Sequence, residues 1–255
     1  MLNSSSARAH AIIRSLVMIG GVAALLWSAA VLPSLRRTAP VAAAAARVLA
    51  NDQFRPSALE NVVADIEAKS AALFPQRLTR AEALVRLRIA EGAMTSKTGP
   101  ESGDELIASA ERSVIRALTL NPSDSFLWLM VYSVRTIQYG FDLENLRLLA
   151  QSYAMGPYEG WISLRRNRSA LAVLSMLSES TKSAVISEFA AMVDTDFIEN
   201  TALNLRGVGW QYRERLLAAL VSVDVVSRQK LYRRLKADGI TVSVPGIPFD
   251  ERPWR

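Results

Sequence analysis

The side chains that most often carry enzyme chemistry are nearly absent from this sequence. It contains no cysteine, and its single histidine, His10, stands ahead of a long apolar stretch. Histidine is the usual general base near neutral pH, and cysteine supplies thiol nucleophiles and zinc-thiolate ligands. Catalytic triads, cysteine-histidine pairs and histidine-metal centres are therefore excluded from the chain after His10. No glycine-rich phosphate loop is present either, and we expect no cofactor.

Carboxylates are the remaining reactive groups. A catalytic carboxylic acid has to stay protonated, which requires burial or a neighbouring carboxylate. Glu179-Ser180, after an apolar stretch, resembles the catalytic glutamate region of lytic transglycosylases, which implies a helical envelope enzyme that acts on glycans. The Gly-Leu-Met-Gln stretch that those enzymes carry downstream is missing, and Ser183-Ala-Val-Ile186 lies in the region instead. We expect Glu179 to contact solvent at a helix end and the protein not to be an enzyme.

Aromatic and arginine side chains could form a binding surface. Aromatic rings stack on sugars or hold peptides, and guanidinium groups pair with carboxylates and phosphates. The candidate partner-binding residues are Tyr132, Tyr139, Tyr153, Tyr158, Arg165, Arg166 and Arg168, with Trp161 beside them. Core packing is the alternative for the aromatic rings, and a solvated helix surface is the alternative for the arginines. An acidic polysaccharide is one ligand that these residue types would suit.

Composition favours helices and argues against nucleic-acid binding. The net charge is +6 over 255 residues, with 12 glycines and 10 prolines. Positive charge is spread along the chain, whereas nucleic-acid binders usually concentrate it on one stripe. A basic run from Arg228 to Lys236 could lie on anionic lipid, but its apolar positions also suit packing onto the domain. We expect no nucleic-acid partner and an all-α fold.

An N-terminal segment has the length and composition of a membrane anchor. Residues 15–35 carry no charge over 21 positions, which as a helix span roughly 30 Å, the thickness of the hydrocarbon core. Arg36 and Arg37 follow as interfacial anchors. A cleaved signal peptide is the alternative, but its apolar region is usually shorter. A short tail before an early anchor commonly stays in the cytoplasm, so we expect the rest of the chain to be exported.

Capping signals divide the chain into a series of helices. Ser57 and Thr79 each precede a glutamate by three residues, and Asp104, Asp142, Ser180 and Asp224 are further candidate N-caps. We expect a tail at 1–14, a transmembrane anchor at 15–37, an alanine-rich linker at 38–55, one α-helical domain at 56–239, and an extended proline-containing tail at 240–255.

One stretch resembles the tetratricopeptide repeat. Asn121-Pro122 ends a helix and Trp128 begins the next, and a second tryptophan, Trp161, follows 33 residues later. The positions that match the repeat are Ala110, Val114, Ala117, Leu118, Pro122 and Trp128. The resemblance implies antiparallel helical hairpins stacked into a scaffold that binds other proteins. An irregular helical bundle is the alternative.

These observations predict a membrane-anchored helical scaffold in a bacterial cell envelope. We expect one span at residues 15–37 in the inner membrane, contact with its lipid, and a periplasmic domain that binds other envelope proteins. An accessory role in polysaccharide or envelope assembly follows by analogy only. The alternatives are a glycan-active enzyme and a polysaccharide-binding module without catalysis.

Overall fold

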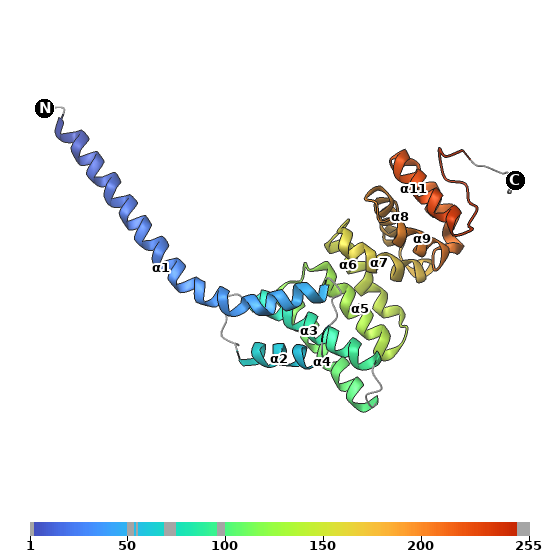
Figure 1. The fold of residues 1–255 in the computed structure, drawn as a ribbon, viewed down its shortest axis with the longest axis horizontal. Helices are drawn as coiled ribbons and strands as arrows, with labels where there is room; N and C mark the ends of the chain where they lie inside the picture. The colour runs from blue at the N-terminus through green and yellow to red at the C-terminus, as the bar shows by residue number, and fades with distance from the viewer. Residues whose placement is uncertain (1–2, 50–53, 55, 69–74, 96–99, 249–255) are drawn as a thin grey trace. The chain divides into compact units, whose positions relative to one another are not determined.

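The computed structural model describes residues 3–49, 54, 56–68, 75–95 and 100–248. Within these residues every regular element is a helix, which confirms the expected all-α fold (Figure 1). The chain forms two compact units, Met1–Leu120 and Asn121–Arg255. The boundary falls inside the single domain expected at 56–239, at the Asn121-Pro122 turn. Each unit is described separately below.

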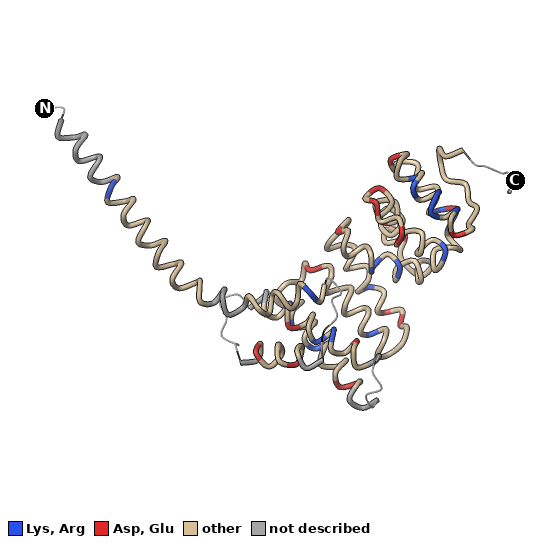
Figure 2. The backbone as a smooth tube through the Cα atoms, viewed as in Figure 1, with Lys and Arg blue, Asp and Glu red and all other residues tan. Residues whose placement is uncertain are grey.

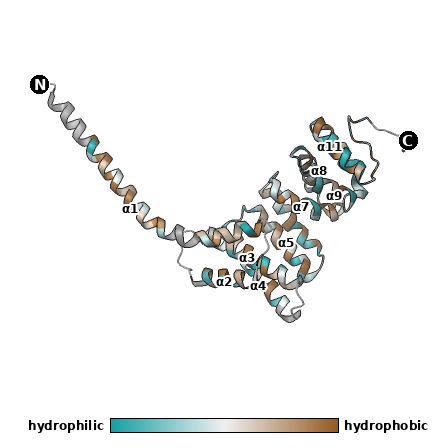
Figure 3. Cartoon of the chain, in the orientation of Figure 1, coloured by the Kyte–Doolittle hydropathy of each residue, from teal (hydrophilic) through white to brown (hydrophobic). Residues whose placement is uncertain are grey.

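Helix α1 (Asn3–Leu49) contains the one described segment that is long and apolar enough to cross a membrane. The segment runs from Ile13 to Pro33 over 21 residues and is not buried against the rest of the structure. Compared with the anchor expected at 15–37, the segment begins two residues earlier and ends four residues earlier. Arg14 is the only charged residue in it. Figure 2 shows the segment in tan apart from the blue near its start, and Figure 3 shows its apolar colouring.

The alanine-rich stretch that was expected to be a linker continues α1 as helix and packs into the first unit. Its side chains Val41 and Ala45 are buried, and α1 packs against α3 (Pro75–Thr95). Alanine adds no bulk beyond its Cβ, so the two helices can approach closely. Residues 39–49 therefore tie the apolar segment directly to a folded core.

The first unit is completed by α2 (Pro56–Ala68) and α4 (Pro100–Leu120), which pack on α3. Ala110, Val114 and Ala117 are buried on α4, as their helical spacing predicted. Helix α4 ends at Leu120, immediately before Asn121-Pro122. Arg86 on α3 donates to Glu82 on the same helix at 2.9 Å and joins α3 to α4 by donating to the Ser109 hydroxyl at 3.1 Å.

Several predicted N-caps are wrong because the helices begin earlier. Helices α2, α3 and α4 each begin at a proline, so Ser57, Thr79 and Asp104 lie inside them. Proline suits the first helical position because its missing N–H would have no partner there. Helix α8 is capped by Ser178, whose hydroxyl accepts from the Thr181 amide at 3.3 Å, rather than by Ser180. The sequence also predicts that the helix beginning near Ser57 runs to about Phe74, and residues 69–74 lie outside the described residues.

The second unit is a bundle of short helices around α8. Its elements are α5 (Ser125–Tyr139), η1 (Leu143–Asn145), α6 (Leu146–Met155), α7 (Gly160–Ala172), η2 (Leu174–Met176), α8 (Glu179–Asp194), α9 (Ile198–Arg206), η3 (Trp210–Tyr212), α10 (Arg213–Ala218), η4 (Ala219–Ser222) and α11 (Val225–Ala237). Helix α8 packs against α6, α7, α9, α10 and α11. Val185, Phe189 and Val193 on α8 are fully buried, so this helix is the centre of the core.

Two predicted N-caps in this unit, Asp142 and Asp224, are confirmed, and Asp124 caps a third helix. Asp124 accepts from the amides of Phe126 and Leu127 at the start of α5. Asp142 accepts from Glu144 at the start of η1, and Asp224 accepts from Val226 at the start of α11. Each is a local contact of the kind that a sequence pattern can reveal.

After α11 the described C-terminal segment has no regular structure, and the extended conformation that its prolines predicted is interrupted by a turn at Pro245 and Gly246, where the Ile247 amide donates to the Val244 carbonyl at 3.1 Å and Gly246 has a φ of 73°. Val242 and Val244 are buried, and the guanidinium of Arg228 on α11 donates to the Pro245 carbonyl. Residues 240–248 therefore pack along their own unit. The remainder of the expected tail, 249–255, lies outside the described residues.

Candidate interaction surface

A buried ion pair lies at the centre of the second unit. Arg166 on α7 and Glu188 on α8 have side-chain exposures of 0% and 2%. The Arg166 Nε donates to Glu188 Oε1 at 3.1 Å, and its Nη1 and Nη2 donate to the carbonyls of Ser152 and Gly156 at 2.7 and 3.0 Å. The guanidinium thus neutralises a buried carboxylate and also bonds the C-terminal end of α6.

The other polar groups around Glu188 are satisfied as well. The Tyr153 hydroxyl donates to Glu188 Oε2 at 2.7 Å, and the Ser163 hydroxyl donates to Oε1 at 2.8 Å. Burial is the main cause that raises the pKa of Tyr153 well above its ordinary value, and the Glu188 charge adds to it. Asn167 and Asn204 extend the network to α9 through a bond of 3.2 Å. A fully paired site without solvent access holds helices together and has no group free for a substrate.

The buried network also fixes the turn between α6 and α7. Arg166 holds the Gly156 carbonyl, and two residues later Tyr158 has a left-handed φ of 62°. A Cβ at Gly156 would lie 2.3 Å from Glu159 Oε1 and 2.4 Å from Ser125 Oγ, so only glycine fits there without movement. A left-handed backbone is unfavourable for a tyrosine and persists only where neighbouring contacts impose it. Tyr158 lies in this turn with 65% of its side chain exposed.

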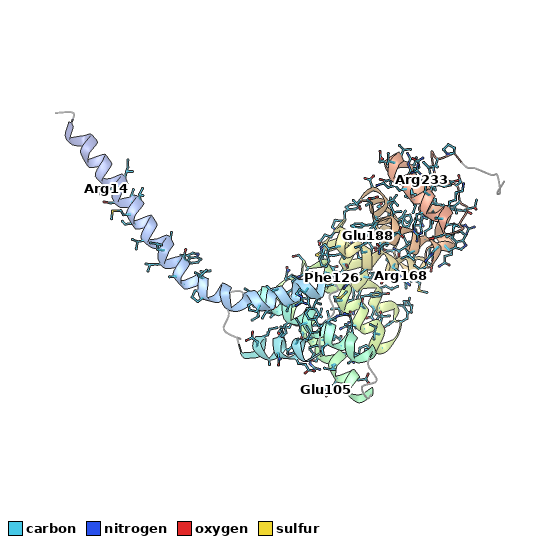
Figure 4. All side chains as sticks on the ribbon, in the orientation of Figure 1. Arg14, Glu105, Phe126, Arg168, Glu188 and Arg233 are labelled. Carbon is cyan, nitrogen blue, oxygen red and sulfur yellow. The ribbon has the colours of Figure 1, made fainter. Side chains whose placement is uncertain are left out.

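An exposed aromatic and cationic stripe runs along α7. We define the α7 stripe as Trp161, Arg165 and Arg168, which lie at helical spacing on one face. The Trp161 ring, 42% exposed, rests on the buried ring of Phe126 with 4.7 Å between centroids. The Arg165 guanidinium lies 5.8 Å from the same Phe126 ring. Figure 4 labels Phe126, Arg168 and the buried Glu188 in this unit.

The structure divides the predicted binding residues into two groups. Tyr132, Tyr153 and Arg166 are buried, so their side chains contact the interior of the unit rather than a partner. Tyr139 and Tyr158 are exposed by 67% and 65%, and Arg165 and Arg168 are exposed. Tyr158, Arg165 and Arg168 lie on or next to α7, whereas Tyr139 ends α5. Glu188, Ser163 and Asn167 were not predicted, because nothing close to them in sequence marks them as partners of Arg166.

Two other predicted features have structural roles in the second unit. On α11, Lys230 pairs with Asp196 at 2.8 Å and Arg234 pairs with Glu199 at 2.6 Å, so this basic helix uses these charges to bind its neighbours. Glu179 is fully exposed, and a hydrogen bond from Lys182 lowers its pKa. A general acid needs the opposite shift, so Glu179 does not fit that role.

The described residues contain no group of three or more metal-ligating side chains placed to hold an ion. The chain matches no known protein family, no curated protein sequence and no solved structure. The function is therefore argued from the residues and contacts alone.

Proposed function

We propose that this protein is a single-pass, membrane-anchored helical scaffold that binds another protein of the cell envelope through the α7 stripe. The proposal rests on one combination of features. The apolar segment Ile13–Pro33 is exposed, and the exposed α7 stripe lies on a helix that the buried Arg166–Glu188 pair joins to α8. The first supports a membrane location, and the second supports a binding surface that the fold holds in place.

The apolar segment supports the anchor. Leu25, Leu26 and Trp27 on α1 are exposed by 71%, 67% and 73%. Apolar side chains in such a row are costly in water, because burial of apolar surface is favourable by about 25 cal/mol per Å². A bilayer removes that cost. We propose an inner-membrane location with the helical units in the periplasm, since a short N-terminal tail before an early anchor commonly stays in the cytoplasm.

The α7 stripe supports an acidic partner. Trp161 supplies a large ring on a rigid support, and Arg165 and Arg168 supply guanidinium groups that match carboxylates. No acidic side chain among the described residues pairs with Arg168 or Arg165. Tryptophan and arginine are the residue types that most often dominate binding energy in protein interfaces. We therefore expect the partner to present aspartate or glutamate next to an apolar side chain.

Site-specific photocrosslinking of the full chain in native membranes tests the proposal. A benzophenone amino acid at position 168 should give one defined protein adduct, and the substitutions Arg165→Glu and Trp161→Ala should reduce its yield. The control is the same probe at the exposed position 183 on α8. The proposal is wrong if position 168 gives no adduct, or if both positions give the same adducts.

An acidic polysaccharide is the second candidate ligand, and the placement of an exposed tryptophan on the same helix face as two exposed arginines favours it. Indole rings stack on sugars, and guanidinium groups pair with uronate carboxylates. Retention of the full chain on an acidic polysaccharide column, lost in Trp161→Ala, together with absence of a protein adduct at position 168, would favour this ligand over a protein.

A further inference from the structure

An open cavity of about 310 Å³ lies in the second unit. It is lined by one aromatic ring, one carboxylate, two serine hydroxyls and small apolar side chains: Tyr158, Ser187, Ala190, Ala191, Asp194, Ala219, Ser222 and Val223. These residues come from the α6–α7 turn, from one face of α8 and from η4 with the residue after it. We call it the Tyr158–Asp194 cavity.

The charge of this cavity is negative. Asp194 is its only charged lining residue, and neither lysine nor arginine lines it. Asp194 Oδ1 accepts a hydrogen bond from the Asp224 backbone amide at 3.2 Å, which orients the carboxylate. Among the described residues Asp194 has no cationic partner, whereas nearby Asp196 pairs with Lys230. Asp194 is exposed at the open side of the cavity, and a carboxylate without a counter-ion favours a cationic ligand.

The other lining groups match an ammonium ion. Ser187 and Ser222 offer hydroxyl oxygens from two different elements, and Tyr158 offers its ring and its phenol oxygen. An ammonium group has three N–H donors that point in different directions, whereas a guanidinium presents its donors in one plane. Acceptors on separate elements suit the ammonium, and an aromatic ring attracts such a cation through its π face. The small side chains of Ala190, Ala191 and Ala219 leave room for an alkyl chain.

The strained backbone at Tyr158 is an independent observation at the same place. Its φ is 62°, it follows Gly156 by two residues in the turn whose Gly156 carbonyl Arg166 holds, and 65% of its side chain is exposed. A left-handed backbone is unfavourable for a tyrosine, yet the fold keeps it at a residue that lines the cavity. Such outliers concentrate at ligand sites.

We propose that the Tyr158–Asp194 cavity binds a primary ammonium group, with its charge on Asp194 and its alkyl chain against Tyr158 and the alanines. The group belongs either to a small free amine or to a lysine side chain of a protein. This proposal is independent of the α7 stripe, because it uses an anionic cavity and not the cationic surface.

Saturation-transfer NMR on the full chain in nonionic detergent micelles tests the proposal with n-butylammonium chloride. Asp194→Asn should weaken binding about tenfold, as expected for a lost charge-assisted contact. Tyr158→Leu should weaken it about two- to fivefold, the effect of losing the ring face. Asp194→Asn keeps an oxygen that can accept from Asp224, so the fold is expected to survive, and circular dichroism checks this.

Matched controls separate a specific site from nonspecific attraction. Asp196→Asn removes a neighbouring carboxylate that does not line the cavity and should leave the affinity unchanged. n-Butanol, which has the same alkyl chain without the charge, should not bind, and empty micelles define the background. The proposal is overturned if n-butylammonium does not bind, if n-butanol binds equally well, or if Asp194→Asn retains wild-type affinity.

Nα-acetyl-lysine methylamide distinguishes the two sources of the ammonium group. Binding at least as tight as that of n-butylammonium assigns the cavity to a lysine side chain of a protein. Exclusion of the blocked lysine, with n-butylammonium still bound, assigns it to a small free amine. Both results support the ammonium site.

Discussion

Arg166 and Glu188 form an ion pair inside the second unit, with side-chain exposures of 0% and 2%. The pair joins α7 to α8, and Arg166 also binds the carbonyls of Ser152 and Gly156 at the end of α6. Removing one partner leaves the other charge buried without compensation, which costs more than the pair itself contributes.

Replacement of Arg166 should therefore destabilise the protein strongly. We expect Arg166→Met to lower the free energy of unfolding by about 3–5 kcal/mol, measured by urea denaturation of the full chain in detergent. Arg166→Met combined with Glu188→Leu should lose less than the sum of the two single substitutions. Arg168→Met, on the exposed face of the same helix, should stay within about 0.5 kcal/mol of wild type. A loss below about 1 kcal/mol for Arg166→Met would contradict the structural role.

The bond between Tyr153 and Glu188 predicts a dependence of stability on alkaline pH. Tyr153→Phe should lower the free energy of unfolding by roughly 1.5–3 kcal/mol near pH 7, because a hydrogen bond to a charged group is lost. The folded state raises the Tyr153 pKa, so the folded chain holds this proton more tightly than the unfolded chain. The difference in the free energy of unfolding between wild type and Tyr153→Phe should stay constant up to about pH 10, the pKa of tyrosine in the unfolded chain. It should shrink as the pH rises from there toward the folded pKa.

Urea denaturation at a series of pH values measures that difference. Tyr139→Phe is the control at an exposed tyrosine, 67% accessible, and should remain within about 0.5 kcal/mol of wild type at pH 7. A Tyr153→Phe difference that grows above pH 10 would have the wrong sign for a raised pKa.

Gly156 should not tolerate a side chain. Gly156→Ala places a Cβ where Glu159 Oε1 and Ser125 Oγ already lie, and we expect a loss of about 1–3 kcal/mol in the free energy of unfolding. Gly92→Ala is the matched substitution, because Gly92 lies inside α3 with no atom within 4 Å of the added carbon. It should raise stability by roughly 0.5–1 kcal/mol through better helix propensity. Equal effects at both positions would contradict the packing of the α6–α7 turn.

Removal of the N-cap at Asp124 should have a smaller and local effect on stability. Asp124→Ala removes the acceptor for the amides of Phe126 and Leu127, at 3.1 and 3.2 Å, and should cost about 1 kcal/mol. Asp124→Asn should retain most of that stability. Ser123→Ala, one residue earlier, should have little effect, since its hydroxyl bonds only Asn121 in the turn. Thermal denaturation followed by circular dichroism compares the three variants.

Features that depend on neighbours in sequence could be predicted. Asp142 and Asp224 were identified as caps because a cap bonds amides two or three residues away. The caps proposed at Thr79 and Asp104 were wrong because Pro75 and Pro100 start those helices first. The same residue pattern can occur inside a helix or at its start, and here only the upstream proline distinguishes the two positions.

The site depends on long-range pairing, which the pattern does not contain. Arg166 and Glu188 are 22 residues apart and lie on different helices. Arg166 stands in a run of polar residues that suggests a solvated surface, yet it lies four residues after Ile162 and four before Ala170, both of which are buried. That spacing was a signal that its side chain points inward. The Tyr158–Asp194 cavity also combines separate helices and could not be predicted.

Labelling of single cysteines with a membrane-impermeant maleimide tests the central claim most directly, because the natural chain contains no cysteine. Spheroplasts of a bacterial host would carry the full chain with Ser6→Cys or Ser183→Cys, at positions on either side of the Ile13–Pro33 segment. A membrane-anchored scaffold with its helical units in the periplasm predicts labelling of Ser183→Cys in intact spheroplasts and of Ser6→Cys only after lysis, with both chains in the membrane fraction. Labelling of Ser6→Cys alone before lysis, or recovery of the full-length chain in the soluble fraction, would contradict it.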